Sequence, residues 1–227
     1  MAKRIDTSAH RKNRNYGPSV FLRRVLWASA AVLFRLSHRR TGPPQIGYVG
    51  NLAAEWIDWL NIREMVQRQP SAEFTFWGPL PKEYQSKPNL AAILEMPNCV
   101  FPGLTSPSDI IEACADIDVW LLCFKAKRVL GRPVNSPKML EYLATGKTVV
   151  GSWLEAYQDS ELVSLADEGR ADKTPALLDH VLGQLDKFNS VDLMRRRREF
   201  ALAHSYDRHL DQILSLIGSA PGRDPLP

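Results

Sequence analysis

The sequence predicts an α/β fold built on a Rossmann-like, doubly wound parallel sheet. Short apolar segments at 45–50, 72–78 and 99–103 each end in glycine and alternate with segments of helical periodicity. The run DVWLLCF at 118–124 is almost continuously apolar, which is typical of a strand buried on both faces. Strands separated by helices indicate a parallel sheet with helices on both faces. In such sheets, ligands bind outside the carboxyl ends of the strands.

The remaining elements follow from periodicity and from helix-start signals. A helix at about 54–69 follows the first strand, and both Trp56 and Trp59 are expected in the core. Ser106 at the cap and Pro107 at the first position predict a helix after the third strand. The elements expected further along are a helix at 136–145, a strand at 147–151, a short strand near 162–166, and helices at about 174–188 and 190–217.

Positive charge is concentrated at the start of the chain. Residues 1–45 contain ten Lys and Arg and one acid, so they carry +9, and the remaining 182 residues carry −5. A mildly acidic body is a poor candidate for nucleic-acid binding, so no nucleic-acid partner is expected.

The basic start divides into two predicted segments. Residues 1–17 are expected to be a disordered basic tail, and residues 18–44 a basic amphipathic helix and its linker. Within the helix, at 19–37, the uncharged run from Val25 to Phe34 is about half of what a membrane span needs. Aromatic, Leu and Arg residues in this pattern favour contact with an anionic membrane surface. The alternative is a helix that covers an apolar face of the body or of a partner.

Cysteine and histidine show no pattern typical of a metal site or a catalytic triad. Cys99, Cys114 and Cys123 lie in or beside apolar runs without metal-ligand spacing, so buried, reduced thiols are expected and no metal is. The histidines lie in the leader or in the terminal helices, and no catalytic residue can be identified. The run RRRR at 195–198 is expected on a solvated helix face.

The helix at 136–145 carries the strongest candidate site. Its first turn offers free backbone N–H groups and Lys138, although the helix dipole disfavours a cation there. N–H groups with an ammonium suit a phosphate, and Glu141, one turn further along, can accept two hydroxyl hydrogen bonds from a ribose. Together they suit a nucleoside diphosphate. The alternatives are a surface lysine paired with an acid and an ordinary surface glutamate.

Glycines at the strand ends are the other candidates. Gly50 and Asn51 close the first strand without a GxGxxG pattern, which argues against a nicotinamide or flavin dinucleotide site. Gly50 either lets the backbone approach a ligand or makes a tight turn, and the same two interpretations apply to Gly78.

Several segments together resemble a known family. They are IGYVGNLAAEWIDW (46–59), FTFWGP (74–79), NCVFPGL (98–104), DVWLLCF (118–124), NSPKMLEYLATGKTVV (135–150) and AHSYDRHLDQILSLI (203–217). In order and spacing they resemble the C-terminal half of GT-B glycosyltransferases of the family 4, or group 1, type, especially bacterial cell-surface polysaccharide enzymes. The resemblance covers about residues 45–218, and residues 219–227 are expected to be a disordered tail.

The resemblance implies a role for each candidate residue. Glu141 would bind the ribose, Ser136 and Lys138 would lie at the diphosphate, and Gly50 and Asn51 would lie beside the diphosphate or the sugar. There are two departures. Many members have a glutamate eight residues before the ribose glutamate, where this chain has Pro133. The N-terminal half, which normally provides the acceptor site, is expected to be absent, with the basic leader in its place.

The expected function is transfer of a glycosyl group from a nucleotide diphosphate sugar to a hydroxyl acceptor, polysaccharide or lipid-linked. A partner chain or a homodimer partner would supply the acceptor half. No cofactor or metal is expected, and the resemblance implies retention of anomeric configuration. The expected location is the cytoplasm, and a peripheral position on the inner membrane face is the further option. The alternatives are a compact stand-alone transferase and a truncated, non-catalytic module that binds nucleotide sugar or a protein partner.

Overall fold

The computed structural model of the protein describes residues 42–125 and 137–205. The predicted tails at 1–17 and 219–227, the leader helix at 19–37 and Ser136 lie outside the described residues.

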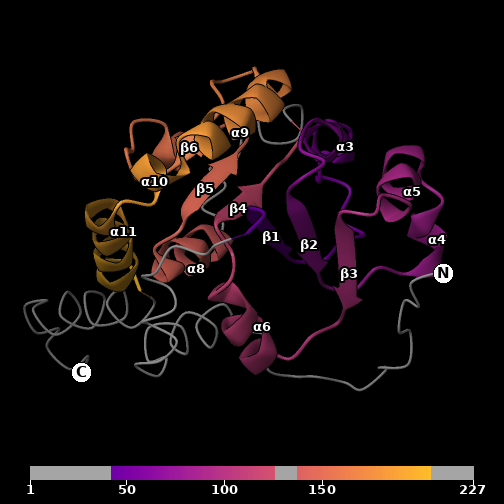
Figure 1. Cartoon of the computed structure of the whole chain (residues 1–227), viewed down its shortest axis with the longest axis horizontal. Coiled ribbons are helices and arrows are strands. Elements are labelled where there is room, and N and C mark those ends of the chain that lie inside the picture. Colours follow the sequence, from indigo (N-terminus) through magenta and orange to yellow (C-terminus); the bar gives the residue numbers. More distant parts are fainter. Residues whose placement is uncertain (1–41, 126–136, 206–227) are drawn as a thin grey trace, which may run out of the picture.

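Six parallel strands form one sheet in the order β3-β2-β1-β4-β5-β6 (Figure 1). The strands are β1 (Gln45–Val49), β2 (Glu73–Trp77), β3 (Cys99–Gly103), β4 (Val119–Leu122), β5 (Thr148–Gly151) and β6 (Ser164–Leu165). This confirms the predicted Rossmann-like, doubly wound parallel sheet. The chain winds outward from β1 in one direction and returns to β4 on its other side, so the topological switch point lies between β1 and β4.

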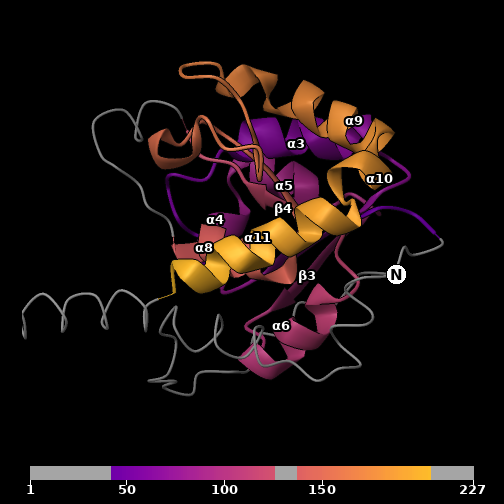
Figure 2. The same ribbon diagram turned by 90° about the vertical axis from the view of Figure 1, so that its left-hand side faces the viewer.

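Helices cover both faces of the sheet. On one face lie α3 (Trp59–Arg68), α5 (Pro88–Leu94) and α9 (Thr174–Gly183), and on the other lie α6 (Pro107–Cys114), α8 (Pro137–Thr145) and α11 (Val191–Ala203) (Figure 1). Figure 2 shows α11 running along α8. The shorter elements are α4 (Lys82–Gln85), α10 (Leu185–Phe188) and single 3₁₀ turns at Glu155–Tyr157 and Ala171–Lys173.

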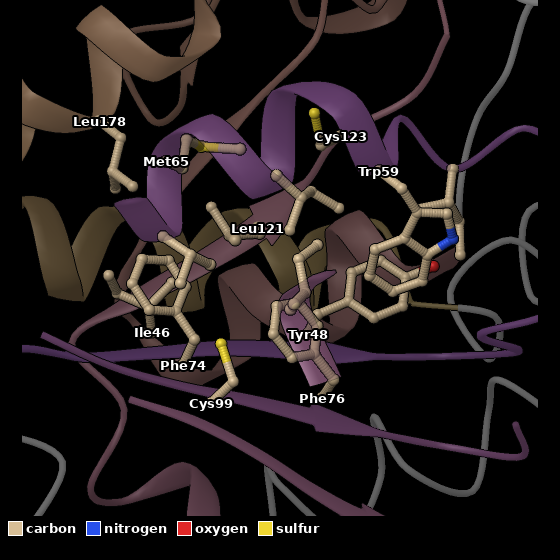
Figure 3. Packing of buried hydrophobic residues seen from close by; sticks show 14 of the residues in the cluster. Ile46, Tyr48, Trp59, Met65, Phe74, Phe76, Cys99, Leu121, Cys123 and Leu178 are labelled. Atoms are coloured by element: carbon tan, nitrogen blue, oxygen red, sulfur yellow. The ribbon is translucent and has the colours of Figure 1, made fainter. Parts of the chain in front are cut away.

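Two apolar cores lie on opposite faces of the sheet, and β4 contributes to both. Leu121 and Cys123 pack in the core under α3 and α9 (Figure 3), whereas Trp120 and Leu122 pack in the core under α8. Alternate residues of a strand point to opposite faces, so a strand between two helical layers must be apolar throughout. The prediction made from DVWLLCF is therefore confirmed, as is the burial of Cys99, Cys114 and Cys123.

The first helix begins later than the sequence predicted. Asp58 caps α3, because its carboxylate accepts hydrogen bonds from the backbone N–H of Asn61 at 3.2 Å and from Asn61 Nδ2 at 2.7 Å. Trp59 lies inside the helix and is 8% exposed, as expected. Trp56 lies before the cap and is 48% exposed, so its predicted place in the core is wrong.

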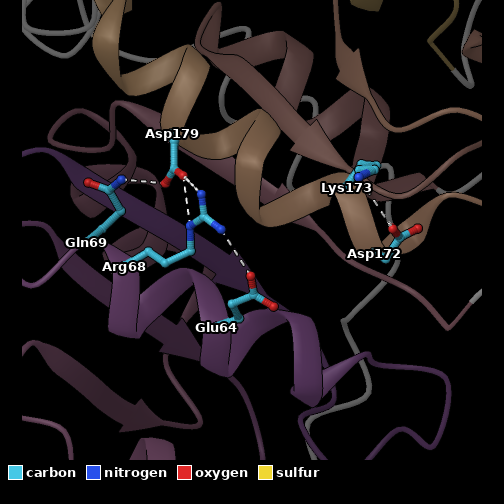
Figure 4. Close-up of polar contacts among 6 residues, drawn as sticks. All are labelled: Glu64, Arg68, Gln69, Asp172, Lys173 and Asp179. Atoms are coloured by element: carbon cyan, nitrogen blue, oxygen red, sulfur yellow. Dashed lines mark hydrogen bonds and ion pairs between the residues drawn. The ribbon is translucent and has the colours of Figure 1, made fainter.

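Two further differences concern helices. The predicted helix at 174–188 is broken, because α9 ends at Gly183 and α10 is a separate turn. The helices α4 and α5, between β2 and β3, were not predicted. Figure 4 shows how α3 and α9 are joined: Arg68 Nε donates to Asp179 at 2.8 Å and Gln69 Nε2 donates to the same carboxylate at 2.6 Å.

The arginine run on α11 is not a uniformly solvated face. Arg195 is exposed and pairs with Asp192 and Glu199, but Arg197 is 1% exposed. The Arg197 guanidinium donates to the carbonyl oxygens of Leu162 at 2.8 Å and Gly146 at 3.0 Å. The prediction of a solvated face is therefore wrong for Arg197.

Within residues 42–125 and 137–205, no helix has the length and apolar character needed to cross a membrane.

Candidate functional site

The candidate site lies at the carboxyl end of β1, beside the switch point. Here the backbone turns at Gly50, whose N–H donates to the carbonyl of Trp77 at 2.9 Å. The N–H of Gly78 donates in the same way to the carbonyl of Gly103 at 2.9 Å. The strand ends are thus tied into one continuous rim.

Gly78 is required by close packing of this rim. It has φ +136°, and a Cβ at this position would lie 1.7 Å from the carbonyl oxygen of Gly50. No side chain is compatible with either feature. Of the two interpretations of Gly78, the geometry supports the turn, since its missing side chain makes room for backbone.

Gly50 makes room for a different group. A Cβ on Gly50 would lie 2.2 Å from the Lys138 Nζ atom. The Lys138 side chain therefore reaches from the first turn of α8 across the end of β1. Two residues 88 positions apart in the sequence, predicted for the site on separate grounds, are in direct contact.

The Lys138 ammonium has a tyrosine as its neighbour. Its Nζ lies 3.4 Å from the Tyr48 hydroxyl oxygen, to which it donates, and 5.1 Å from the centre of the Tyr48 ring. Burial lowers the pKa of Lys138, and the charge of Glu141 opposes this effect.

Glu141 lies three residues further along α8. Burial raises the pKa of its carboxyl to about 7, and the Lys138 charge acts in the opposite direction. Burial thus disfavours the charged forms of both side chains. A pair of partly buried, oppositely charged groups at a switch point is the arrangement expected of a site that receives a charged or polar ligand.

Tyr142 holds α8 against β1, and sequence analysis did not single it out. Its hydroxyl accepts from the backbone N–H of Val49 at 2.9 Å and lies 3.3 Å from the carbonyl oxygen of Val49. Its ring stacks on Trp120 with 4.5 Å between ring centres. Both bonds are made one residue before Gly50, so Tyr142 sets the distance between α8 and the rim.

Asn51 lies on the outer part of the rim. Its side chain is exposed, and its Oδ1 atom accepts from the backbone N–H of Ala53 at 3.1 Å. This bond stabilises the turn after β1 and fixes the orientation of the Asn51 side chain.

An apolar cavity of about 260 Å³ adjoins the same rim. It lies between the ends of β1 and β2 and the start of α6, and its lining includes Val49, Gly50, Trp77, Leu104 and Ile110. Gly50 borders both the cavity and the Lys138 ammonium, so these two features lie next to each other on the rim.

The described part of the chain brings together Gly50, Asn51, Gly78 and Lys138, with Glu141 one helical turn away. Ser136 lies outside the described residues. In the same part of the chain, no group of three His, Cys, Asp or Glu side chains is placed to hold a metal ion.

The fold is an α/β, Rossmann-like fold that matches solved glycosyltransferase structures. Neither a family model nor a curated protein matches the sequence. Similar solved structures include HepE from Anabaena in complex with UDP, at TM-score 0.64 and 15% identity, covering 86% of this chain and 55% of that one.

Two further solved structures have a similar fold. A glycosyltransferase from Rickettsia africae has TM-score 0.64 at 13% identity, covering 87% of this chain and 54% of that one. Sucrose-phosphate synthase from Thermosynechococcus elongatus has TM-score 0.62 at 13% identity, covering 85% and 50%. At these identities the likeness shows the fold alone. This chain spans about half the length of each of the three structures.

Proposed function

We propose that the chain is the donor domain of a glycosyltransferase and binds a nucleotide diphosphate sugar at the end of β1. The observation that carries this proposal is the contact of the Lys138 ammonium with Gly50 at the switch point. The ammonium and the first-turn N–H groups of α8 would bind the diphosphate. HepE, which shares the fold, has been crystallised with UDP and with UDP-glucose.

Glu141 would bind the ribose of the donor. An ionised carboxylate can accept hydrogen bonds from two neighbouring hydroxyl groups, and Glu141 lies one helical turn from the proposed phosphate position. The apolar cavity beside Gly50 has walls that suit a flat base. The phosphate and base subsites would then meet at Gly50.

In the proposed reaction, the glycosyl group passes from the donor to an acceptor hydroxyl, and the nucleoside diphosphate leaves. The Lys138 ammonium and the α8 N–H groups would stabilise the negative charge that develops on the leaving diphosphate. We propose that no metal is needed for this step, and that the anomeric configuration is retained, as the family resemblance implies. The acceptor, a polysaccharide or lipid-linked hydroxyl, would be held by a partner chain or a second copy.

Donor binding can be tested by thermal shift with UDP, GDP, ADP and dTDP. One nucleotide should raise the Tm of the wild-type chain, because a ligand at about a hundred times its Kd adds roughly 2.7 kcal/mol to the free energy of unfolding. Glu141→Ala should abolish that shift. Glu168→Ala, at an exposed position in the loop after β6, serves as the control and should retain it. If no nucleotide stabilises the full chain, the proposal fails for the isolated chain.

The phosphate assignment has a separate test. Lys138→Ala should weaken binding of the selected nucleoside diphosphate about tenfold or more, because the ammonium would contact the phosphates. Binding of the corresponding nucleoside should change much less, since Lys138 would affect the ribose site only by lowering the pKa of Glu141. Isothermal titration calorimetry measures both affinities. Equal losses for the two ligands, or no loss, would contradict the assignment.

Turnover separates the transferase from the non-catalytic module that the sequence also allows. A chain that binds a donor sugar should release free nucleoside diphosphate when an acceptor and the acceptor-binding partner are supplied. Binding without turnover in that complete mixture would favour the non-catalytic module.

A further inference from the structure

The seat of Lys138 is built from uncharged groups. Its Nζ atom occupies space that a side chain on Gly50 would fill. It lies 3.4 Å from the Tyr48 hydroxyl oxygen and 5.1 Å from the centre of the Tyr48 ring. Among the residues that the structure describes, no carboxylate forms an ion pair with this ammonium. A carboxylate partner would neutralise the ammonium, whereas a hydroxyl and a ring face hold it in place and leave its charge available.

Tyr48 is rigidly held. It is 1% exposed, and its ring lies beside Phe76, with 6.5 Å between the ring centres (Figure 3). It points to the face of the sheet that carries α3, whereas Lys138 belongs to α8 on the opposite face. The lysine can reach the Tyr48 hydroxyl only past the end of β1, at the position where Gly50 has no Cβ.

Tyr48 and Gly50 therefore both determine where the Lys138 Nζ atom lies: Tyr48 accepts its hydrogen bond, and Gly50 leaves space for it. Lysine has a long and flexible side chain, and its immobilisation costs conformational entropy at the moment of binding unless it has already been ordered. A lysine that is ordered before the ligand arrives binds an anion more tightly than a mobile one.

We propose that Tyr48 is the positioning residue of the anion site: its hydroxyl and ring hold the Lys138 ammonium over Gly50, oriented toward the diphosphate. This inference rests on the proposed function for the identity of the anion. The arrangement of the three residues does not depend on that function, so it can be tested with and without a nucleotide.

The first test is Tyr48→Phe, which removes one oxygen and keeps the ring in the core. Binding of the selected nucleoside diphosphate should weaken about three- to tenfold, as for loss of one weak hydrogen bond to a charged group, with the nucleoside unaffected. The control is Tyr157→Phe, a buried tyrosine in the other core, which should leave both affinities unchanged. Unchanged or tighter diphosphate binding by Tyr48→Phe would overturn the proposal.

The second test needs no nucleotide. Competitive labelling of amines with acetic anhydride between pH 6 and 11, read by mass spectrometry of the full chain, follows the titration of Lys138. Loss of the hydroxyl acceptor should lower the pKa of Lys138 further, because the ammonium loses a hydrogen bond. Glu141, whose charge opposes the effect of burial on the pKa of Lys138, is unchanged in this variant. An identical titration in wild type and Tyr48→Phe would overturn the proposal even if the chain binds no nucleotide.

The third test uses Gly50→Ala, whose Cβ would lie 2.2 Å from the Lys138 Nζ atom, too close for the ammonium to stay in place. Once the ammonium is displaced, Tyr48→Phe should have no further effect on the labelling of Lys138. The control is Gly183→Ala, at the end of α9, where a Cβ would have no atom within 4 Å. If the effects of the two substitutions on Lys138 labelling add in the double variant, the two residues act independently. That result would contradict the proposal that both position the same ammonium.

Discussion

At the scale of single residues, Glu141 links the site to pH. Burial raises the pKa of its carboxyl from 4.5 to about 7. Between these values the folded protein holds a proton that the unfolded chain has lost, so the free energy of unfolding falls as pH rises. The contribution of Glu141 to stability is present below about pH 4.5 and is lost as pH rises through 7.

Glu141→Gln should therefore change the pH dependence of stability. Near pH 5 the variant and the wild type should unfold at similar urea concentrations. At pH 8 the variant should be more stable by roughly 2–3 kcal/mol, since it cannot ionise. Urea titrations between pH 5 and 8 measure the difference. Glu168→Gln, at an exposed position, should show no such trend, and a constant difference between Glu141→Gln and wild type would contradict the buried carboxylate.

The sequence indicated the candidate site residues, but it did not indicate the residues that hold them in position. Gly50 and Lys138 stood out because a strand-ending glycine and a first-turn lysine break local patterns. Tyr48 and Tyr142 did not, because a tyrosine in an apolar strand or helix looks like an ordinary core residue. Only the structure reveals that Tyr48 receives Lys138 and that Tyr142 bonds to the backbone of Val49.

At the scale of elements, α8 is anchored at its end by α11. Arg197 donates to the carbonyl oxygen of Gly146, directly after α8, and to that of Leu162 before β6. Arg198 donates to the carbonyl of Thr145 at 3.1 Å. These guanidinium groups satisfy carbonyls at the negative end of the α8 dipole, where helix hydrogen bonds are lacking. Burial lowers the pKa of Arg197 to about 10, and no carboxylate among the described residues pairs with it.

Arg197→Ala should destabilise the protein by about 3–5 kcal/mol, because it leaves buried carbonyl oxygens without donors and opens a cavity. Arg195→Ala on the same helix removes only exposed ion pairs and should cost about 0–1 kcal/mol. Urea unfolding of the two variants beside wild type gives both values. A similar decrease in the free energy of unfolding for Arg197→Ala and Arg195→Ala would mean that the buried Arg197 does not stabilise the packing of α8 and α11.

The periodicity of α11 contained a signal for this anchor. Four consecutive residues cover about 300° of a helix, so a run of four arginines cannot all face solvent on a packed helix. Met194, Arg197 and Ala201 follow the spacing of one helix face, and all three are buried. The start of α3 shows the opposite case, because the hydrogen bonds that Asn61 donates to the Asp58 carboxylate set the helix start after Trp56.

At the scale of the whole molecule, the sequence predicted the class of sheet but not the order of its strands. Alternating strands and helices require a parallel sheet, and right-handed crossovers restrict how it can wind. The side of β1 on which β4 pairs depends on contacts between distant segments, such as the stacking of Trp120 on Tyr142. That position of β4 brings α8 to the end of β1 and so assembles the candidate site.

The uneven charge of the whole chain leads to a last prediction, for the leader at 19–37. If this basic, amphipathic segment contacts an anionic membrane, the full chain should co-sediment with vesicles containing phosphatidylglycerol and not with pure phosphatidylcholine. High salt should release it. Reversal of Arg23 and Arg24 to Glu should weaken binding more than tenfold, at about 1 kcal/mol for each lost charge.

Reversal of Lys3 and Arg4 to Glu changes the net charge of the chain by the same amount outside the amphipathic segment. This control should bind more tightly than the Arg23 and Arg24 variant, because its apolar residues and nearby arginines can still act together at the membrane surface. Equal losses in the two variants would mean that net charge alone attracts the chain. No binding to either vesicle would leave the leader to cover an apolar face of a protein, the alternative that its sequence pattern also allows.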